Sequence, residues 1–307
     1  MEKFEVTILG CGSATPSLRH FPSSQVLNIR EKLYMIDCGE GTQIQMRRNK
    51  LKFSHLGHIF ISHIHGDHCF GLIGLISTFN LLGRTSELHI HAPEELKAIL
   101  DHMLQTFCHE MTYKVVFHPI DTKEYNLIFE DRSVCVYSIP LRHRIACSGF
   151  LFKEKPTLPH IRRDMIDFYH IPLYAINDIK QGADWVTADG KIVPNNQLTK
   201  PAEKARSYAY CSDTIYIPEL SQYLENIDLL YHEATFDKSL HARASETFHT
   251  TAEQAATLAL NSHARQLVIG HYSSRYTTEE ELLHEAKSIF PNSILAQENL
   301  KIAIKCD

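Results

Sequence analysis

The fold of this chain is decided by one segment, Ser62-His63-Ile64-His65-Gly66-Asp67-His68. It places three imidazoles and one carboxylate within six consecutive residues, directly after the strand-like run His58–Ile61. Imidazole and carboxylate ligands suit zinc and its first-row neighbours. Four donors so close in the chain cannot all reach one tetrahedral ion without strain, so the segment predicts two metal ions side by side.

Paired metal ions about 3.5–4 Å apart are a recurrent device for hydrolysing phosphate esters, so the segment indicates a metallohydrolase. The chain holds 20 histidines in 307 residues, which favours metal chemistry further, although most of them need have no functional role. The alternative, a polar loop with incidental histidines, fits poorly with so dense a group of donors.

The composition is that of a globular protein, with 44% apolar and 22% charged residues. A net charge of −5 gives no bulk attraction to nucleic acid, so RNA binding would need a local basic patch. The eight cysteines are dispersed without a C-x-x-C pair, which favours free thiols in a reducing cytoplasm. The start Met1–Phe4 has no signal-peptide pattern, and no apolar stretch is long enough to span a membrane.

Strands and helices alternate along most of the chain, which predicts α/β layers. The expected strands are Phe4–Leu9, Gln25–Arg30, Leu33–Asp37, His58–Ile61, Tyr113–His118, Ser133–Ile139, Tyr208–Cys211, Leu229–His232 and Leu267–Gly270. The expected helices are Pro93–Phe107, Thr251–His263 and Thr278–Ile289. Residues 153–195 are proline-marked and basic at their start and break this pattern, so we expect an insertion that projects from the core.

Three further donors follow predicted strands: His143, Asp213 and His271. Each alone is weak, because a lone histidine is usually not a ligand and an aspartate after a strand usually caps a turn. Together with residues 62–68, however, they give four strand ends with donors for the same class of ion. This is the pattern expected when a site lies along one edge of a sheet.

The order H-x-H-x-D-H, then His, Asp and His, resembles that of the metallo-β-lactamase superfamily over nearly the whole chain. Within the superfamily the chain resembles the ribonuclease Z family of tRNA 3′-endonucleases. The segments that carry this resemblance are Leu9–Ala14, Ile36–Gln43, Ser62–His68 with Gly71–Leu75, His232–Thr235, Phe248–Ala252 and Ser273–Tyr276. The last three are the more specific ones.

The resemblance implies a four-layer αββα sandwich forming a single domain over residues 1–307, with a flexible substrate-binding arm inserted at 153–195. It implies two zinc ions per subunit, one held by His63, His65 and His143 and the other by Asp67, His68 and His271. Asp213 would bridge them, since a carboxylate has two oxygens. A hydroxide between the ions would be the nucleophile, and Asp67 could orient or deprotonate the water.

By the same resemblance His249 is the general acid that protonates the leaving 3′-oxygen, and Glu233 holds His249 in position. Arg275 is a candidate phosphate clamp. Two alternatives stay open from the residues alone. His249 could be a buried structural histidine, and Arg275 could be a surface side chain packed over Tyr276.

The implied substrate is precursor tRNA, cut to leave a 3′-hydroxyl on the tRNA and a 5′-phosphate on the trailer. In the family the arm grips tRNA away from the cut, and Lys153, Lys155, Arg162 and Arg163 suit phosphate contacts. The family's glycine-proline motif is only partly present, as His170–Tyr174. Lys204 and Arg206 resemble a basic loop that could face the acceptor stem, whereas Arg47–Lys52 is better read as a solvated helix end.

A homodimer is implied by resemblance only. The alternative function is a hydrolase of the same fold acting on small esters, as a phosphodiesterase or an arylsulfatase would. A third alternative, a non-catalytic RNA-binding protein, fits poorly because every expected ligand is present.

Overall fold

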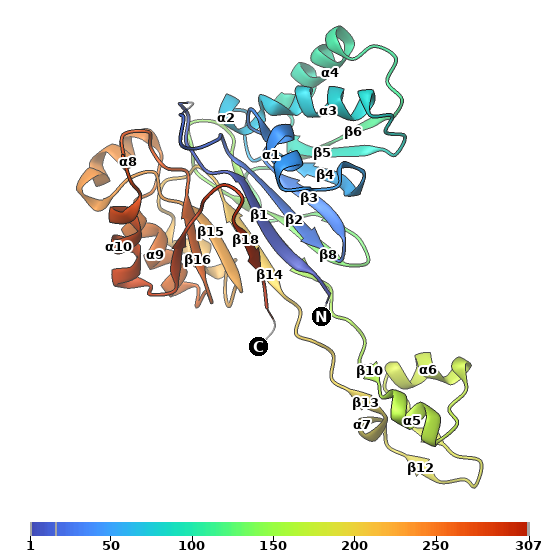
Figure 1. Cartoon of the computed structure of the whole chain (residues 1–307). Helices are drawn as coiled ribbons and strands as arrows, with labels where there is room; N and C mark the ends of the chain where they lie inside the picture. Colours follow the sequence, from blue (N-terminus) through green and yellow to red (C-terminus); the bar gives the residue numbers. More distant parts are fainter. Residues whose placement is uncertain (1, 16, 306–307) are drawn as a thin grey trace. The chain divides into compact units, whose positions relative to one another are not determined.

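The computed structural model of the chain describes residues 2–15 and 17–305. These residues form two compact units (Figure 1). The first combines the chain up to Lys153 with Arg206–Lys305, and the second spans Glu154–Ala205. In the part of the chain that the structure describes, no helix is long and apolar enough to cross a membrane.

The first unit is built on two mixed seven-stranded sheets, counted over the described residues. The strands of the first sheet, in spatial order, are β18 (Lys301–Ala303), β1 (Phe4–Gly10), β2 (Ser24–Ile29), β3 (Lys32–Ile36), β4 (Leu56–Phe60), β5 (Leu88–Pro93) and β6 (Val115–Ile120). The strands of the second are β17 (Ser293–Leu295), β16 (Leu267–Gly270), β15 (Leu229–Glu233), β14 (Ser207–Cys211), β9 (Ser148–Glu154), β8 (Val134–Pro140) and β7 (Leu127–Glu130).

Helices cover the outer face of each sheet (Figure 1). On the first sheet these are α1 (Thr42–Arg48), α3 (Gly71–Leu81) and α4 (Glu95–Phe107), and on the second α9 (Ala252–Asn261) and α10 (Glu280–Ile289). Between the sheets the rings of Phe60 and Phe152 meet edge to face, with centroids 5.3 Å apart. The four-layer αββα architecture expected from the sequence is confirmed.

Strand alternation explains how β4 serves both faces of its sheet. Ile59 belongs to the core under the first group of helices, whereas Phe60 belongs to the core between the sheets. Strands β3, β4, β5 and β6 run parallel to one another, and so do β14, β15, β16 and β17. The loops that follow parallel strands emerge at one edge of a sheet, which is where a site can be assembled.

The second unit has a small core of its own, formed by Ile171, Ala175, Ile179, Val193 and Leu198. Its elements are β10 (His160–Ile161), α5 (Arg163–Phe168), α6 (Leu173–Lys180), β11 (Trp185–Val186), β12 (Ile192–Val193), α7 (Asn195–Leu198) and β13 (Thr199–Lys200). Because β10 pairs with β13, the unit closes only after residue 195 and extends to Ala205. It is therefore longer than the insertion expected at 153–195.

Candidate metal centre

The loops after four strands of the first unit bring together the donor groups expected from the sequence. Residues 62–68 follow β4 and lead into the short helix α2 (Gly66–Cys69), where Asp67 and His68 lie. His143 follows β8, Asp213 follows β14, and His271 follows β16. The donor atoms form two groups, and the Asp213 carboxylate lies between them.

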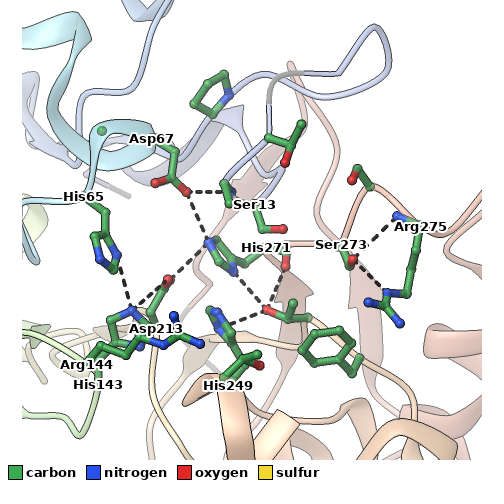
Figure 2. A pocket seen from close by; sticks show the side chains of 18 of the residues that line it. Ser13, His65, Asp67, His143, Arg144, Asp213, His249, His271, Ser273 and Arg275 are labelled. Atoms are coloured by element: carbon green, nitrogen blue, oxygen red, sulfur yellow. Dashed lines mark hydrogen bonds and ion pairs between the residues drawn. The ribbon is translucent and has the colours of Figure 1, made fainter. Parts of the chain in front are cut away.

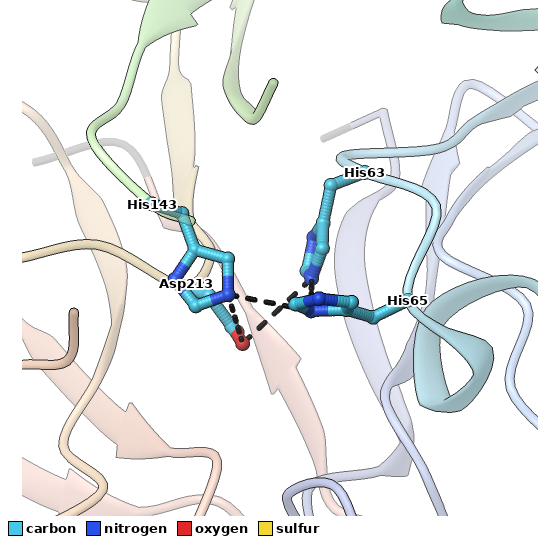
Figure 3. Close-up of side chains that lie close together, drawn as sticks. All are labelled: His63, His65, His143 and Asp213. Carbon is cyan, nitrogen blue, oxygen red and sulfur yellow. Dashed lines mark hydrogen bonds and ion pairs between the residues drawn. The ribbon is translucent and has the colours of Figure 1, made fainter. Parts of the chain in front are cut away.

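The first group consists of His63, His65, His143 and Asp213 (Figure 3). Nδ1 of His65 lies 3.0 Å from Nε2 of His63 and 3.3 Å from Nε2 of His143. Oδ2 of Asp213 lies 3.7 Å from the first of these Nε2 atoms and 3.8 Å from the second. Two nitrogen ligands of one tetrahedral zinc ion are about 3.3 Å apart, so these spacings suit a single ion.

The second group consists of Asp67, His68 and His271, with the other oxygen of Asp213 beside them. Asp213 Oδ1 lies 3.4 Å from His68 Nε2 and 3.1 Å from His271 Nε2. Asp67 Oδ2 lies 3.4 Å and 3.6 Å from the same two nitrogens. The two oxygens of Asp213 therefore face different groups, which is the geometry of a bridging carboxylate.

Buried atoms without a hydrogen-bond partner show that these residues fit metal ions. They are His68 Nε2, His271 Nε2 and Asp213 Oδ1, and all three lie on the side of the second group. A buried polar atom without a partner costs about 1–3 kcal/mol. A cation between these atoms would remove that cost, because neutral imidazole and ionised carboxylate are ligands of first-row divalent metals. The donor set at this site therefore suits divalent metal ions.

Asp37, at the end of β3, orients the second group. Its Oδ2 accepts hydrogen bonds from His68 Nδ1 at 2.7 Å and from the Tyr210 hydroxyl at 2.8 Å. Its Oδ1 accepts the backbone N–H of Ser62 at 2.8 Å, so the carboxylate also anchors the start of the ligand loop. With Nδ1 donating, the lone pair of His68 Nε2 points into the site.

Asp37 also has an unusual backbone. Its φ is 56°, and that of the ligand His271 is 62°, both in the left-handed region that side chains other than glycine rarely adopt. Such strain is typical of functional sites, where the surrounding structure holds a residue in place. Asp37 lies in the segment Ile36–Gln43 that carries the family resemblance, but nothing in the sequence shows that it contacts His68.

Two further hydrogen-bonding contacts orient the rings of His271 and His143. The Thr235 hydroxyl lies 2.9 Å from His271 Nδ1 and donates to Oε2 of Glu233 at 2.7 Å. The carbonyl oxygen of Phe248 accepts a hydrogen bond from His143 Nδ1 at 3.0 Å. Each contact fixes one ring nitrogen and leaves Nε2 directed at the donor group.

His249 lies beside both groups, in the turn between α8 (His241–Thr247) and α9. Its Nδ1 is 2.9 Å from Oε1 of the fully buried Glu233. Burial alone would lower the pKa of His249, but the charge of Glu233 and their hydrogen bond raise it to about 9. Figure 2 shows His249, Asp67 and His271 around the same space, from different elements of the unit.

A cavity of about 640 Å³ opens over these groups. Its lining includes Arg275, as expected, and two arginines that the sequence did not single out, Arg144 and Arg243. The Arg275 guanidinium lies 5.0 Å from the ring centroid of Phe236, and its Nε donates to the Ser273 hydroxyl at 3.2 Å (Figure 2). The alternative of packing over Tyr276 is therefore replaced by packing over Phe236, at the cavity wall.

Two basic segments outside the cavity can now be placed. Arg206 is 4% exposed, and its guanidinium donates to the carbonyl oxygens of Glu2 and Ile304. The expectation that Arg206 faces an acceptor stem is wrong, because the side chain is used inside the fold. Arg47 and Arg48 are exposed and end α1, as the helix-end reading predicts.

The chain is similar to proteins of known type. It is 61% identical over 304 residues to the ribonuclease Z of Bacteroides thetaiotaomicron, covering 99% of this chain and 96% of that protein. A family model described as anti-Pycsar protein Apyc1 matches residues 4–156.

Two solved structures resemble the fold. The short form of human tRNase Z superposes with a TM-score of 0.71 at 26% identity, covering 98% of this chain and 99% of that one. The metallo-β-lactamase fold protein YhfI from Bacillus subtilis gives a TM-score of 0.68 at 16% identity, covering 98% of this chain and 100% of that one. With its fold, its donor groups and this identity over nearly its whole length, the chain belongs to the ribonuclease Z family.

Proposed function

We propose that this chain is a zinc-dependent endonuclease that removes the 3′ trailer from precursor tRNA, leaving a 3′-hydroxyl on the tRNA and a 5′-phosphate on the trailer. The observation that carries the proposal is the pair of donor groups sharing Asp213, with the Glu233-paired His249 at their border. The pair of groups suits two zinc ions per subunit.

His63, His65, His143 and one oxygen of Asp213 would hold the first ion. Asp67, His68, His271 and the other oxygen of Asp213 would hold the second. Bound zinc lowers the pKa of water towards about 7 and polarises a phosphoryl oxygen. Nitrogen and oxygen donors at these spacings fit zinc well.

The chain's own residues supply orientation and protons. The Asp67 carboxylate accepts the backbone N–H of Ala14 at 2.8 Å, which fixes its direction and leaves oxygen capacity for the attacking water. As the water attacks phosphorus, the bond from phosphorus to the 3′-oxygen of the tRNA breaks. His249 gives its Nε2 proton to that oxygen, while Glu233 stabilises the ring through Nδ1.

Arginines at the cavity position the phosphates. Arg275 is held by Ser273 and Phe236, so its guanidinium has lost much of its freedom before substrate arrives. Arg144 and Arg243 line the same cavity and add positive charge for the flanking phosphates. These contacts set position rather than sequence preference.

The second unit, Glu154–Ala205, would bind the body of the tRNA as a substrate-binding arm. It carries seven basic and seven acidic residues, so any grip on phosphates must come from local contacts rather than from net charge. Leu173 and Tyr174, in the partial motif, are 86% and 80% exposed and offer apolar contact to RNA. In a homodimer, one subunit's arm would hold a tRNA whose 3′ end lies in the other's site.

The setting we propose is the cytoplasm, where thiols stay reduced. All seven cysteines in the described residues are free, and several are buried.

The test is incubation of the zinc-loaded protein with a precursor tRNA transcript carrying a 3′ extension. We expect one cut near the discriminator base, with a 3′-hydroxyl on the tRNA. Absence of that cut, with hydrolysis of a chromogenic phosphodiester retained, would favour a small-ester hydrolase instead.

A variant in which a short linker replaces residues 154–205 separates the arm from the chemistry. Chromogenic hydrolysis should stay near the wild-type rate while tRNA cleavage falls by an order of magnitude or more, because remote contacts supply binding energy. Equal loss of both activities would show that the unit supports the fold instead.

A further inference from the structure

Three unlike donor side chains meet at a second place in the first unit, away from the two groups described above. Cys11 follows β1, His20 lies in the next loop, and Glu298 precedes β18. Cys11 Sγ is 3.5 Å from His20 Nδ1 and 3.6 Å from Glu298 Oε1. His20 Nδ1 is 3.3 Å from the same Oε1 and 3.1 Å from Oε2 of Glu298. Glu298 is 278 positions from His20 and 287 from Cys11, so the site joins the two ends of the chain.

These separations match the edges of a zinc coordination tetrahedron. With Zn–S near 2.3 Å and Zn–N or Zn–O near 2.0–2.1 Å, sulfur lies about 3.5 Å from a nitrogen or oxygen ligand. A nitrogen and an oxygen ligand lie about 3.3 Å apart. We propose that Cys11, His20 and Glu298 form a third metal site, structural in role, for zinc or another thiophilic divalent cation.

Contacts around the three residues hold them in the orientation that a metal needs. His20 Nε2 is 3.2 Å from Oε1 of Glu279, so a carboxylate receives one ring N–H while Nδ1 faces the sulfur. Carboxylate–histidine–zinc arrangements of this kind fix the tautomer and raise ligand basicity. Glu279 is itself held by Arg19 at 2.9 Å. The backbone N–H of Phe21 donates to Glu298 Oε1 at 2.9 Å.

The three residues lie mostly inside the fold, with Cys11 buried and His20 and Glu298 partly buried. Cys11 is fully buried, and burial raises the pKa of its thiol, which is therefore protonated without a metal. Metal binding would form an S–metal bond and release the thiol proton to solvent, with no change of oxidation state. The Ala296 carbonyl oxygen, 3.5 Å from the same sulfur, offers a further oxygen donor at the site.

The position of the three residues indicates what the third ion would stabilise. Cys11 leads directly into the loop whose Ala14 N–H donates to Asp67 Oδ2. The same loop is tied to the segment after β16 by the Ser13 N–H, which donates to the Tyr272 carbonyl oxygen at 3.2 Å. An ion joining Cys11 and His20 to Glu298 would fasten this loop to the C-terminal part of the unit. It would stabilise the support of Asp67 without touching the substrate.

The experiment is substitution of the whole protein with cobalt(II), followed by absorption spectroscopy and a metal count by mass spectrometry. In the two groups described earlier every proposed ligand is nitrogen or oxygen, so a thiolate-to-cobalt charge-transfer band that depends on Cys11 would report the third site. We expect this band, and three ions per chain. Cys11→Ser and His20→Gln should each lose the band and one ion, and the matched control Cys135→Ser should retain both.

Asp213→Ala separates this site from the proposed catalytic centre, because it should keep the charge-transfer band while losing the other ions. The Cys11→Ser variant should cleave precursor tRNA at the wild-type rate at low temperature but lose the stabilisation that zinc gives to thermal unfolding. If Cys11→Ser does not fold, the His20→Gln variant decides. A wild-type protein with no charge-transfer band would overturn the proposal and leave three hydrogen-bonded side chains.

Discussion

Two groups of histidines border β4 in this molecule, and they behave differently. One surrounds the candidate metal centre and contains the five imidazoles proposed as ligands. The other is an array of His58, His89, His91 and His118, on β4, β5 and β6, facing a cavity beside β7. The array also has short contacts, because His58 Nδ1 lies 3.1 Å from His91 Nε2 and His89 Nδ1 lies 3.0 Å from His118 Nε2.

The two groups of histidines differ in the orientation of their rings. In the array the planes of His58 and His89 differ by 13°, and those of His91 and His118 by 12°, so the rings stack. In the metal centre the plane of His65 lies 80° from that of His63 and 85° from that of His143, so nitrogens converge instead.

The two groups of histidines also differ in the carboxylates that lie near them. Asp67 and Asp213 lie among the ligand rings of the metal centre. Beside the array, the Glu87 carboxylate lies 3.8 Å from His89 Nε2 alone, and Asp131 is engaged by Lys32 and by the Tyr34 hydroxyl. Burial and neighbouring imidazoles lower the pKa of His58 to about 3 and that of His91 to about 2, so these two side chains are neutral at pH 7. A high histidine content alone therefore does not indicate a metal site. Imidazole nitrogens that converge on shared carboxylates do.

The largest effect should come from removing the shared carboxylate. Asp213→Ala should lose both ions of the centre and reduce tRNA cleavage by roughly 10³-fold or more, since metal ions supply several kcal/mol of transition-state stabilisation. Metal analysis and single-turnover cleavage measure the two losses. Asp101→Asn, at a half-exposed position on α4, is the matched control and should change neither. A variant that kept two ions would show that Asp213 is not the bridge.

His249 tests whether a histidine beside the centre has a role other than ligation. His249→Ala should retain the metal content and lose about 10²–10⁴-fold in rate, as expected for a lost general acid. The exposed His102→Ala is its control. Cleavage at the wild-type rate would refute the assignment of the acid.

A substitution at Asp37 tests whether a residue that is not itself a proposed ligand orients the ring of His68. Asp37→Asn replaces the acceptor for His68 Nδ1, and we expect affinity for one ion to fall by about 10–100-fold with the other less affected. Competition with a chelator reports the two affinities. Equal weakening of both ions would place the effect in the fold rather than in His68.

The array should govern acid stability rather than metal content. The pKa values of His58 and His91 are below 6.5 in the folded state, so below pH 6.5 the unfolded chain binds more protons. Stability is then fully present above pH 6.5 and falls as the pH drops towards 3, by up to about 1.4 kcal/mol per pH unit for each histidine.

The double variant His58→Phe with His91→Phe removes both titrating groups but keeps rings in the stack. Its urea unfolding should show a flatter pH dependence than wild type, with unchanged metal content and tRNA cleavage. An identical pH slope would mean that other groups dominate acid unfolding.

The sequence predicted which donor side chains lie together, because each follows a strand and the donors have a fixed order. It missed α3, whose residues Gly71–Leu81 are apolar on almost every side and give no helical period. It also missed Asp37, Arg144 and Arg243, whose roles come from tertiary contacts with segments distant in the chain. The array was equally hidden, since only strand register brings His58 beside His89 and His91 beside His118.

The two oxygens of Asp213 have a consequence for how the centre fills. One side chain serves both donor groups, so the first ion to bind fixes the rotamer and part of the charge that the second ion meets. The two binding events must then be coupled, and each ion changes the affinity of the other by the same factor. A metal titration should therefore depart from the curve of two independent sites.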